Sequence, residues 1–433
     1  MTHPETGEAP SILFINQHYW PDCAATALML TDLAEYLAEQ GVNVHVLCSR
    51  GHYLSGAMEV PAEETHNGVH IHRVRATAFG RETTLGRLTD YASFFANTLR
   101  RVLTGPAYDY IIPLTTPPLL PLVGAIARRV RGQAYGIWSM DLHPDAEVAA
   151  GMFAEDGLPA RMLHALNNAG YRHADFVVDL GTYMKRRLQD KGVAGDRLHT
   201  IPVWNRKDDV TPLPHADNPL RTELGLDDTF VVMYSGNAGV AHRFEEVLAT
   251  MKQLDGHPDI EFVFVGEGPK KDRIQAFADR HALSNFRYLP YFPREDLEHS
   301  LPMADVHLMT LREEMAGIAV PGKLYGIMAA GRPALMVGPE ASEPGETIQI
   351  SGAGRVVDPS QTDTPAQALH DTLLSLYRDD ALRTELGRNG REAFLEHFER
   401  EVCCRKWASL FDRRLNGGSE VGASPQKEAV VGS

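Results

Sequence analysis

The chain of 433 residues contains two successive series in which short apolar segments alternate with helical segments. The first series opens with an apolar run at 11–17, followed by Leu30, Leu33 and Leu37 at helical spacing. Gly41 ends that helix, and a second apolar run follows at 42–48. Strand, helix and strand in close succession form a βαβ unit with parallel strands. Repetition of this unit restricts the chain to the α/β folds.

Both series continue with apolar segments of strand length. In the first series they are 69–76, 108–115, 134–140, 176–181 and 198–202. In the second series they are 230–236, 261–268, 286–291, 305–311, 333–338 and 354–358. We therefore predict two doubly wound, Rossmann-like α/β domains, each built on a parallel sheet.

Changes in composition along the chain suggest the domain limits. We expect a first domain at 10–205, a proline- and charge-rich linker at 206–228 and a second domain at 229–395. An amphipathic helix at 396–415 is expected to cross back to the first domain. The remaining residues, 416–433, are rich in Gly, Ser and Ala, which predicts a disordered tail.

Charge and cysteine content exclude several classes of partner. The net charge of −15 argues against nucleic acid as the main partner. The four cysteines form no CxxC pair, which favours reduced thiols in a cytoplasmic protein. The uncharged segment 111–127 contains four prolines and is too short to span a bilayer. Arg128, Arg129 and Arg131 next to it leave peripheral contact with the inner membrane open.

Two turns in the first series are candidate ligand sites, because ligands of such sheets bind beyond the carboxyl ends of the strands. Ala25 and Thr26 lie where a helix begins, and free N–H groups there bind anions; a plain turn capped by Thr26 is the alternative. Asp141 and His143 follow another strand and suit acid–base chemistry or hydroxyl binding. Their alternative is a solvated loop in which Asp145 caps the next helix.

The second series contains two comparable turns. Gly236 and Asn237, with Arg243 shortly after them, could clamp a diphosphate; a tight turn with a surface arginine is the alternative. Gly322 and Lys323 open a short helix that predicts contact with phosphate or ribose. The chain contains no HExxH, zinc-ligand, Walker A or GxSxG motif, and the turn at 266–269 departs from the dinucleotide fingerprint of dehydrogenases.

Taken together, these segments resemble the retaining glycosyltransferases of family 4, which have the GT-B fold, over about residues 11–412. The resemblance is closest to the branch that builds O-antigen, capsule and exopolysaccharide, including the fucosamine-transferase-like enzymes. The stretches that carry it are YWPDCAATALMLTDLAEYLAEQGVNVHVL, TTPPLLPLVGAIARRVRG, WSMDLHPD, MYSGNAG, FVGEGPKKDRI, YFPREDLEHSLPMADV and VPGKLYGIMAAGRPALMV.

The resemblance implies two Rossmann-like domains facing each other and transfer of a sugar to a hydroxyl group. The donor would be a UDP- or GDP-linked sugar, and the acceptor a glycan or lipid-linked glycan of cell-surface polysaccharide. No metal or other cofactor is expected, because cationic side chains and helix dipoles neutralise the leaving diphosphate. Two alternatives remain: a nucleotide-sugar 2-epimerase on the same fold, and a degenerate, non-catalytic homologue.

The resemblance also implies roles for individual residues. Asp141 and His143 would face the sugar and acceptor, whereas Arg243 and Lys323 would neutralise the diphosphate. The other donor-binding residues would be Ala25, Thr26, Gly236, Asn237, Gly266, Tyr291, Phe292, Gly322, Leu324, Tyr325, Glu343 and Glu346.

Several positions depart from the family pattern. Ile318 and Gly326 occupy the positions of the two family glutamates, so Glu343 or Glu346 would take over ribose recognition. Asn237 stands where a basic residue is expected. Met140 stands where the first-domain histidine would align, which makes His143 its substitute.

Overall fold

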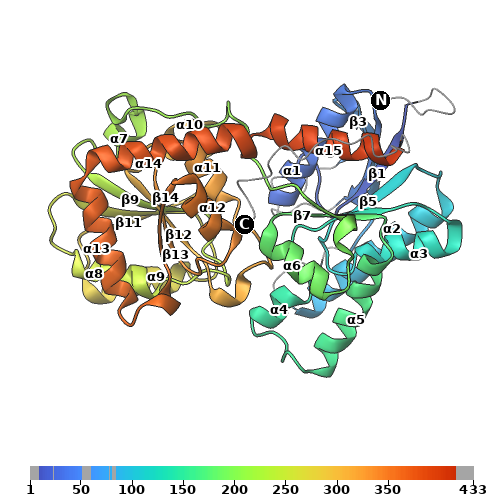
Figure 1. The fold of residues 1–433 in the computed structure, drawn as a ribbon, viewed down its shortest axis with the longest axis horizontal. Helices are drawn as coiled ribbons and strands as arrows, with labels where there is room; N and C mark the ends of the chain where they lie inside the picture. The colour runs from blue at the N-terminus through green and yellow to red at the C-terminus, as the bar shows by residue number, and fades with distance from the viewer. Residues whose placement is uncertain (1–8, 23, 51–59, 78, 80–83, 416–433) are drawn as a thin grey trace. The chain divides into compact units, whose positions relative to one another are not determined.

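The computed structural model describes residues 9–22, 24–50, 60–77, 79 and 84–415. Within them the chain forms two compact units (Figure 1). Of the described residues, unit 1 comprises those up to Pro202 together with residues 403–415, and unit 2 is Val203–Val402. The predicted tail at 416–433 lies outside the described residues.

Unit 1 is built on parallel strands in the order β3-β4-β2-β1-β5, and β5 is joined to a second run, β6-β7-β8, by a bridge between Ile111 and Tyr135. The antiparallel edge strand β3 is the exception to parallel pairing. Its polar sequence, EETH, carries no apolar signal, so the sequence did not predict it. The strands are β1 (Ser11–Ile15), β2 (Asn43–Ser49), β3 (Glu63–His66), β4 (Val69–Val74), β5 (Tyr110–Pro113), β6 (Gly136–Trp138), β7 (Phe176–Asp179) and β8 (Leu198–Thr200).

Helices connect the strands of unit 1, and the last helix of the chain returns to it. Trp407 of that helix is fully buried, with its ring centroid 4.9 Å from Trp138 and 6.5 Å from Phe14 of β1. This aromatic contact attaches the C-terminal helix to the core of unit 1. The helices are α1 (Ala25–Glu39), α2 (Thr84–Thr104), α3 (Pro121–Arg131), α4 (Asp145–Ala149), α5 (Leu158–Arg172), α6 (Thr182–Asp190) and α15 (Arg400–Leu415).

Unit 2 has one six-stranded parallel sheet in the order β11-β10-β9-β12-β13-β14. This is the doubly wound order in which the chain moves outward in both directions from the two central strands. The predicted parallel α/β architecture is confirmed in both units. The strands are β9 (Phe230–Ser235), β10 (Ile260–Val265), β11 (Phe286–Leu289), β12 (Val306–Thr310), β13 (Ala334–Val337) and β14 (Gly354–Val357).

The core of unit 2 lies between the sheet and the helices packed on it. Alternate residues of β9 and β10 form one large apolar cluster with residues of α8, α9 and α13. The helices are α7 (Pro219–Leu224), α8 (Glu245–Gln253), α9 (Lys271–His281), α10 (Leu297–Ser300), α11 (Lys323–Ala329), α12 (Glu343–Ser351), α13 (Pro365–Arg378) and α14 (Asp380–Ala393).

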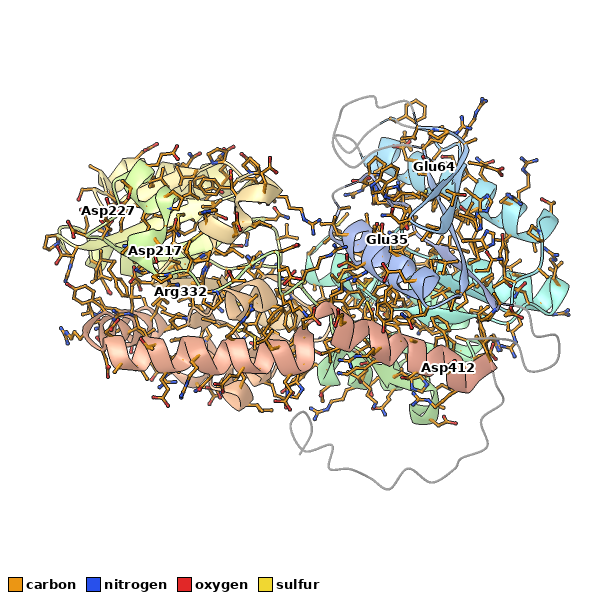
Figure 2. The ribbon with its side chains drawn as sticks, turned by 90° about the horizontal axis from the view of Figure 1, so that it is seen from above. Glu35, Glu64, Asp217, Asp227, Arg332 and Asp412 are labelled. Atoms are coloured by element: carbon orange, nitrogen blue, oxygen red, sulfur yellow. The ribbon has the colours of Figure 1, made fainter. Side chains whose placement is uncertain are left out.

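The segment 206–228, expected to be a linker, is instead an integral part of unit 2. Helix α7 is capped by Asn218, and buried Arg221 donates to the carbonyl of Met303 at 2.6 Å. Arg332 donates to the carbonyl of Leu213 at 2.7 Å (Figure 2). The prolines that suggested a linker start helices and turns, and the change of unit occurs earlier, after Pro202.

Candidate active site

The carboxyl end of the unit 2 sheet has a topological switch point between β9 and β12, where ligands of doubly wound sheets bind. The loops that follow these strands are joined there. The Arg312 N–H donates to the carbonyl of Ala241 at 2.9 Å. His242 Nδ1 lies 2.6 Å from the carbonyl of Thr310. Backbone and side chain together therefore fix the shape of this end of the sheet.

Two glycines allow the loops after β9 and β10 to approach each other. A Cβ on Gly266 would lie 2.3 Å from the carbonyl oxygen of Gly236, and one on Gly268 would lie 2.4 Å from Asn237 Oδ1. Both glycines have positive φ angles, 134° and 138°, which residues with a Cβ rarely adopt. The site is therefore lined by bare backbone that a ligand can approach closely.

Lys323 carries an ammonium group over these loops from the first turn of α11. Its Nζ lies 3.8 Å above the ring centroid of Tyr234 and next to Gly236. Among the described residues this Nζ has no hydrogen-bond partner. Burial lowers the pKa of Lys323 to about 7. The aromatic face favours the charged form, but burial has the larger effect because no described carboxylate offsets it. An anionic ligand would satisfy this cation.

Tyr291 completes this cluster. Its side chain is 52% exposed, and its Cε1 would lie 3.1 Å from a Cβ on Gly266. The structure thus brings together four of the predicted residues, Gly236, Gly266, Tyr291 and Lys323. Exposed Asn237 is adjacent, and exposed Gly322 precedes Lys323.

Arg243 borders a neighbouring pocket of about 330 Å³. The guanidinium group is oriented by the buried carboxylate of Glu246, to which Nε donates at 3.0 Å. His242 links this pocket to the lysine, since burial and then the charge of Lys323 lower the pKa of His242 to about 3. The pocket is lined by His242, Arg243, Glu245, Lys270, Arg312, Glu313 and Glu314.

Three predicted donor-binding side chains pack against apolar residues of unit 2. Leu324 and Tyr325 are buried, and the Tyr325 ring lies 4.5 Å from that of Phe398. Phe292 packs against an apolar cluster that includes Val265. On α11, the residues that follow Lys323 are buried, so their side chains pack against the rest of unit 2.

The two glutamates proposed for ribose recognition lie in different surroundings. Glu343 is buried in the first turn of α12. Glu346 lines a separate pocket of about 240 Å³ together with Phe398. Of the two departing positions, Ile318 is buried, and a Cβ on Gly326 would lie 3.2 Å from Asn205 and Leu301. Packing therefore leaves little room for a side chain at position 326.

In unit 1 the loops after β1, β5 and β6 are joined at the corresponding end of the sheet. The Gln17 N–H donates to the carbonyl of Thr116 at 3.0 Å. Thr115 Oγ1 accepts from the N–H groups of Met140 and Asp141 at 3.1 and 3.0 Å. The side chain of Thr115 thus holds the loop that carries the predicted acid–base residues.

Asp141 and His143 lie together with a carboxylate that the sequence analysis missed, Glu147 of α4. His143 Nδ1 is 2.8 Å from Glu147 Oε1, so Nδ1 carries the proton, because a carboxylate only accepts. Burial alone would lower the pKa of His143, but Glu147, Asp141 and Asp145 outweigh it and raise the pKa. Burial raises the pKa of Asp141. The spacing of four residues between His143 and Glu147 was the available signal.

Two capping roles that belonged to the alternative interpretations are wrong. Ala24, not Thr26, is the N-cap of α1, and Thr26 Oγ1 lies 3.4 Å from Asn16 Nδ2. Ala25 is exposed at the first position of that helix. Asp145 does not cap α4; it pairs with Lys191 at 2.6 Å. The sequence analysis also missed Tyr234, whose ring lies under Lys323, because a tyrosine within a buried strand is expected to be a core residue.

Neither a metal centre nor a membrane span is found in the described part of the chain. No group of three or more His, Cys, Asp or Glu side chains there is arranged to hold a metal ion. None of the described helices combines the length and the apolar character needed to cross a bilayer.

Two family models match the chain in series. A glycosyl transferase 4-like domain matches residues 25–204, and the glycosyl transferases group 1 model matches residues 218–393. Among curated relatives, a Pseudomonas aeruginosa protein named as a glycosyltransferase (WbjE) is 29% identical over 57% of this chain and 61% of its own length, so the match spans less than two thirds of that relative. An Escherichia coli K12 protein named as a colanic acid biosynthesis glycosyl transferase (WcaI) is 25% identical over 84% of this chain and 92% of its own.

Solved structures show the same fold. Sucrose-phosphate synthase from Thermosynechococcus elongatus superposes with a TM-score of 0.75 at 19% identity, covering 93% of this chain and 98% of its own. HepE from Anabaena, solved in complex with UDP-glucose, has a TM-score of 0.68 at 16% identity, covering 93% and 99%. The chain is therefore a glycosyltransferase with the GT-B fold, in which a glycosyl transferase 4-like domain is followed by a group 1 glycosyl transferase domain.

Proposed function

We propose that this glycosyltransferase transfers a sugar from a UDP-linked donor to a hydroxyl group of a glycan or lipid-linked glycan in cell-surface polysaccharide synthesis. The observation that carries the donor site is the buried ammonium of Lys323, which lacks a hydrogen-bond partner among the described residues and lies over a backbone made bare by glycines. A nucleoside diphosphate supplies both the anion and the flexible chain that such a surface accommodates. The UDP-glucose complex of HepE and the name of WcaI support the donor and the pathway.

In this proposal Lys323 binds the diphosphate next to Gly236. Arg243, oriented by Glu246, neutralises charge from the neighbouring pocket. The nucleobase stacks on the exposed ring of Tyr291. Lysine and arginine then stabilise the charge that develops on the leaving group, so the reaction requires no metal ion.

We propose that the reaction proceeds with retention of configuration. The bond between the anomeric carbon and the diphosphate oxygen breaks, and its electron pair leaves with the nucleoside diphosphate. The acceptor oxygen forms the new bond on the same face and gives its proton to the departing phosphate oxygen. Asp141 and His143 of unit 1 serve to bind acceptor hydroxyl groups, since a raised pKa of His143 favours a charged donor of hydrogen bonds.

A thermal-shift screen against UDP, GDP, ADP and CMP, with and without EDTA, tests the donor site. At about 100 times its Kd, a ligand adds roughly 2.7 kcal/mol of stability. We expect a shift with UDP that EDTA does not change. A shift with GDP alone would show that the donor carries guanine rather than uracil. A shift that disappears with EDTA would contradict metal-free binding. Isomerisation of a UDP-sugar without acceptor would identify a 2-epimerase instead.

A further inference from the structure

Helix α5 (Leu158–Arg172) carries three large aliphatic residues on its outer side. Its buried residues are Ala160, Asn167, Gly170 and Tyr171. By contrast, Leu158 is 70% exposed, Met162 57% and Leu166 44%. Helices normally bury their apolar stripe. An exposed aliphatic stripe therefore indicates a surface that another phase or partner covers.

The stripe is regular. Leu158, Met162 and Leu166 are four residues apart, so they lie along one side of the helix over about 12 Å. Exposed Pro159 and Ala165 extend the apolar surface beside them.

The charge of this surface is also distinctive. Helix α5 contains no Asp or Glu, and exposed Arg161 lies beside the stripe. Helix α3, which packs against α5, also lacks acidic residues and ends with Arg128, Arg129 and Arg131. Arg128 donates to the carbonyl of His173 at 3.0 Å, so the C-terminal ends of the two helices meet. Glu155 and Asp156 precede α5 but are not part of it.

The acidic residues of the chain are concentrated elsewhere. Residues 203–402 carry a net charge of −13, whereas the rest of the chain carries −2. A helix with an aliphatic stripe, arginines and no carboxylate is complementary to the interface of an anionic bilayer.

The same helix holds the loop with the acid–base residues. Asn167, on the buried face of α5, donates to the carbonyl of His143 at 2.6 Å. Binding of a partner to the outer face of α5 would thus be coupled to the loop that carries Asp141 and His143.

We propose that α5 is the surface through which the protein docks on an anionic bilayer, with Leu158, Met162 and Leu166 inserted at the interface and Arg161 at the head groups. This assigns peripheral contact to α5 rather than to the Arg128–Arg131 cluster alone, in which Arg128 pairs with Asp175 and Arg131 donates to the carbonyl of Val102. The docking itself does not depend on the proposed function. Only the further idea that docking brings a lipid-linked acceptor to His143 rests on it.

Vesicle flotation of the full chain tests this surface, with vesicles of phosphatidylglycerol and phosphatidylethanolamine compared with phosphatidylcholine alone. The triple variant Leu158→Gln, Met162→Gln, Leu166→Gln removes the stripe but keeps residues that favour helices. The matched control, Ile350→Gln with Leu395→Gln, removes exposed apolar side chains from unit 2. We expect wild type and control to float with anionic vesicles and the triple variant to bind about tenfold less.

Three results would overturn the inference. Wild-type protein could stay in the soluble fraction, or the triple variant could float as wild type does. Alternatively, the wild-type protein could fail to bind vesicles and form a dimer in light scattering, whereas the triple variant is a monomer. That result would show that α5 is a subunit interface. The UDP thermal shift is measured separately on each protein. If flotation occurs without a nucleotide shift, the donor proposal fails and the docking inference stands.

Discussion

The two units share a doubly wound parallel sheet but build the carboxyl ends of their sheets by different means. Unit 2 uses bare backbone at Gly236, Gly266 and Gly268, with one buried ammonium from Lys323. Unit 1 uses paired side chains, of which His143 with Glu147 is the centre. A backbone-lined site uses N–H and C=O groups that every residue has, but it requires glycine where a Cβ would overlap neighbouring atoms. A site made of side chains changes with single substitutions, so we expect the two to respond differently to mutation and pH.

The largest expected effect is at Lys323. In Lys323→Met, the cation that neutralises the leaving group is lost while its volume is kept. We expect turnover to fall roughly 10²–10³-fold, as when one charge-stabilising donor is removed. Measured rates from a UDP-sugar donor provide the test. Folding should be preserved, because the buried ammonium has no hydrogen-bond partner among the described residues. Near-normal rates would remove Lys323 from the site.

The next effect tests the bare backbone of unit 2. In Gly268→Ala, the new Cβ would lie 2.4 Å from Asn237 Oδ1 and 2.6 Å from the nitrogen of Ala238. We expect a loss of about 3 kcal/mol or more, read as a lower melting temperature. Gly256→Ala is the matched control, since Gly256 also has positive φ but has nothing within 4 Å of a Cβ. It should cost only about 1 kcal/mol. Equal shifts would show that close approach does not matter here.

The pH dependence of donor binding follows from the same lysine. Its pKa of about 7 in the free protein means that it is charged below pH 7 and loses the charge as pH rises. Because a bound diphosphate favours the charged form, binding takes up a proton above pH 7. We expect UDP affinity to fall about tenfold between pH 6 and pH 8 in titration calorimetry. Lys323→Met should show no such change; if it shows the same change, another group is responsible.

A smaller effect is expected in unit 1 from Glu147→Gln. The carboxylate raises the pKa of His143 against the effect of burial, so its removal should lower that pKa. The imidazole is charged below its pKa, and the variant should therefore lose the charge at a lower pH than wild type. NMR titration of the His143 ring and the pH profile of kcat/KM measure this change. We expect kcat/KM at pH 7 to fall about fivefold. Glu155→Gln, on an exposed loop, is the control that should leave both unchanged.

Much of the fold was predictable from sequence because short-range patterns specify it. The apolar runs and helical spacings correctly predicted thirteen of the fourteen strands in the described residues, and the parallel sheets, since each run reflects burial of its own strand. The edge strand β3 was missed because it is polar and gains its pairing only from β4. The supposed linker at 206–228 was misread because prolines occur both in linkers and at helix starts.

For the candidate site, the sequence by itself determined which strand ends carry ligand-binding residue types, because the end of a strand and the start of a helix are local features. It singled out Lys323, Gly236, Asp141 and His143 as candidates in this way. Only the tertiary structure decided that Lys323 lies over Tyr234, that Glu147 holds His143, and that Leu324 and Tyr325 face the core. The physical reason is that burial, and with it the pKa of a lysine or the orientation of an imidazole, depends on neighbours brought together from distant parts of the chain.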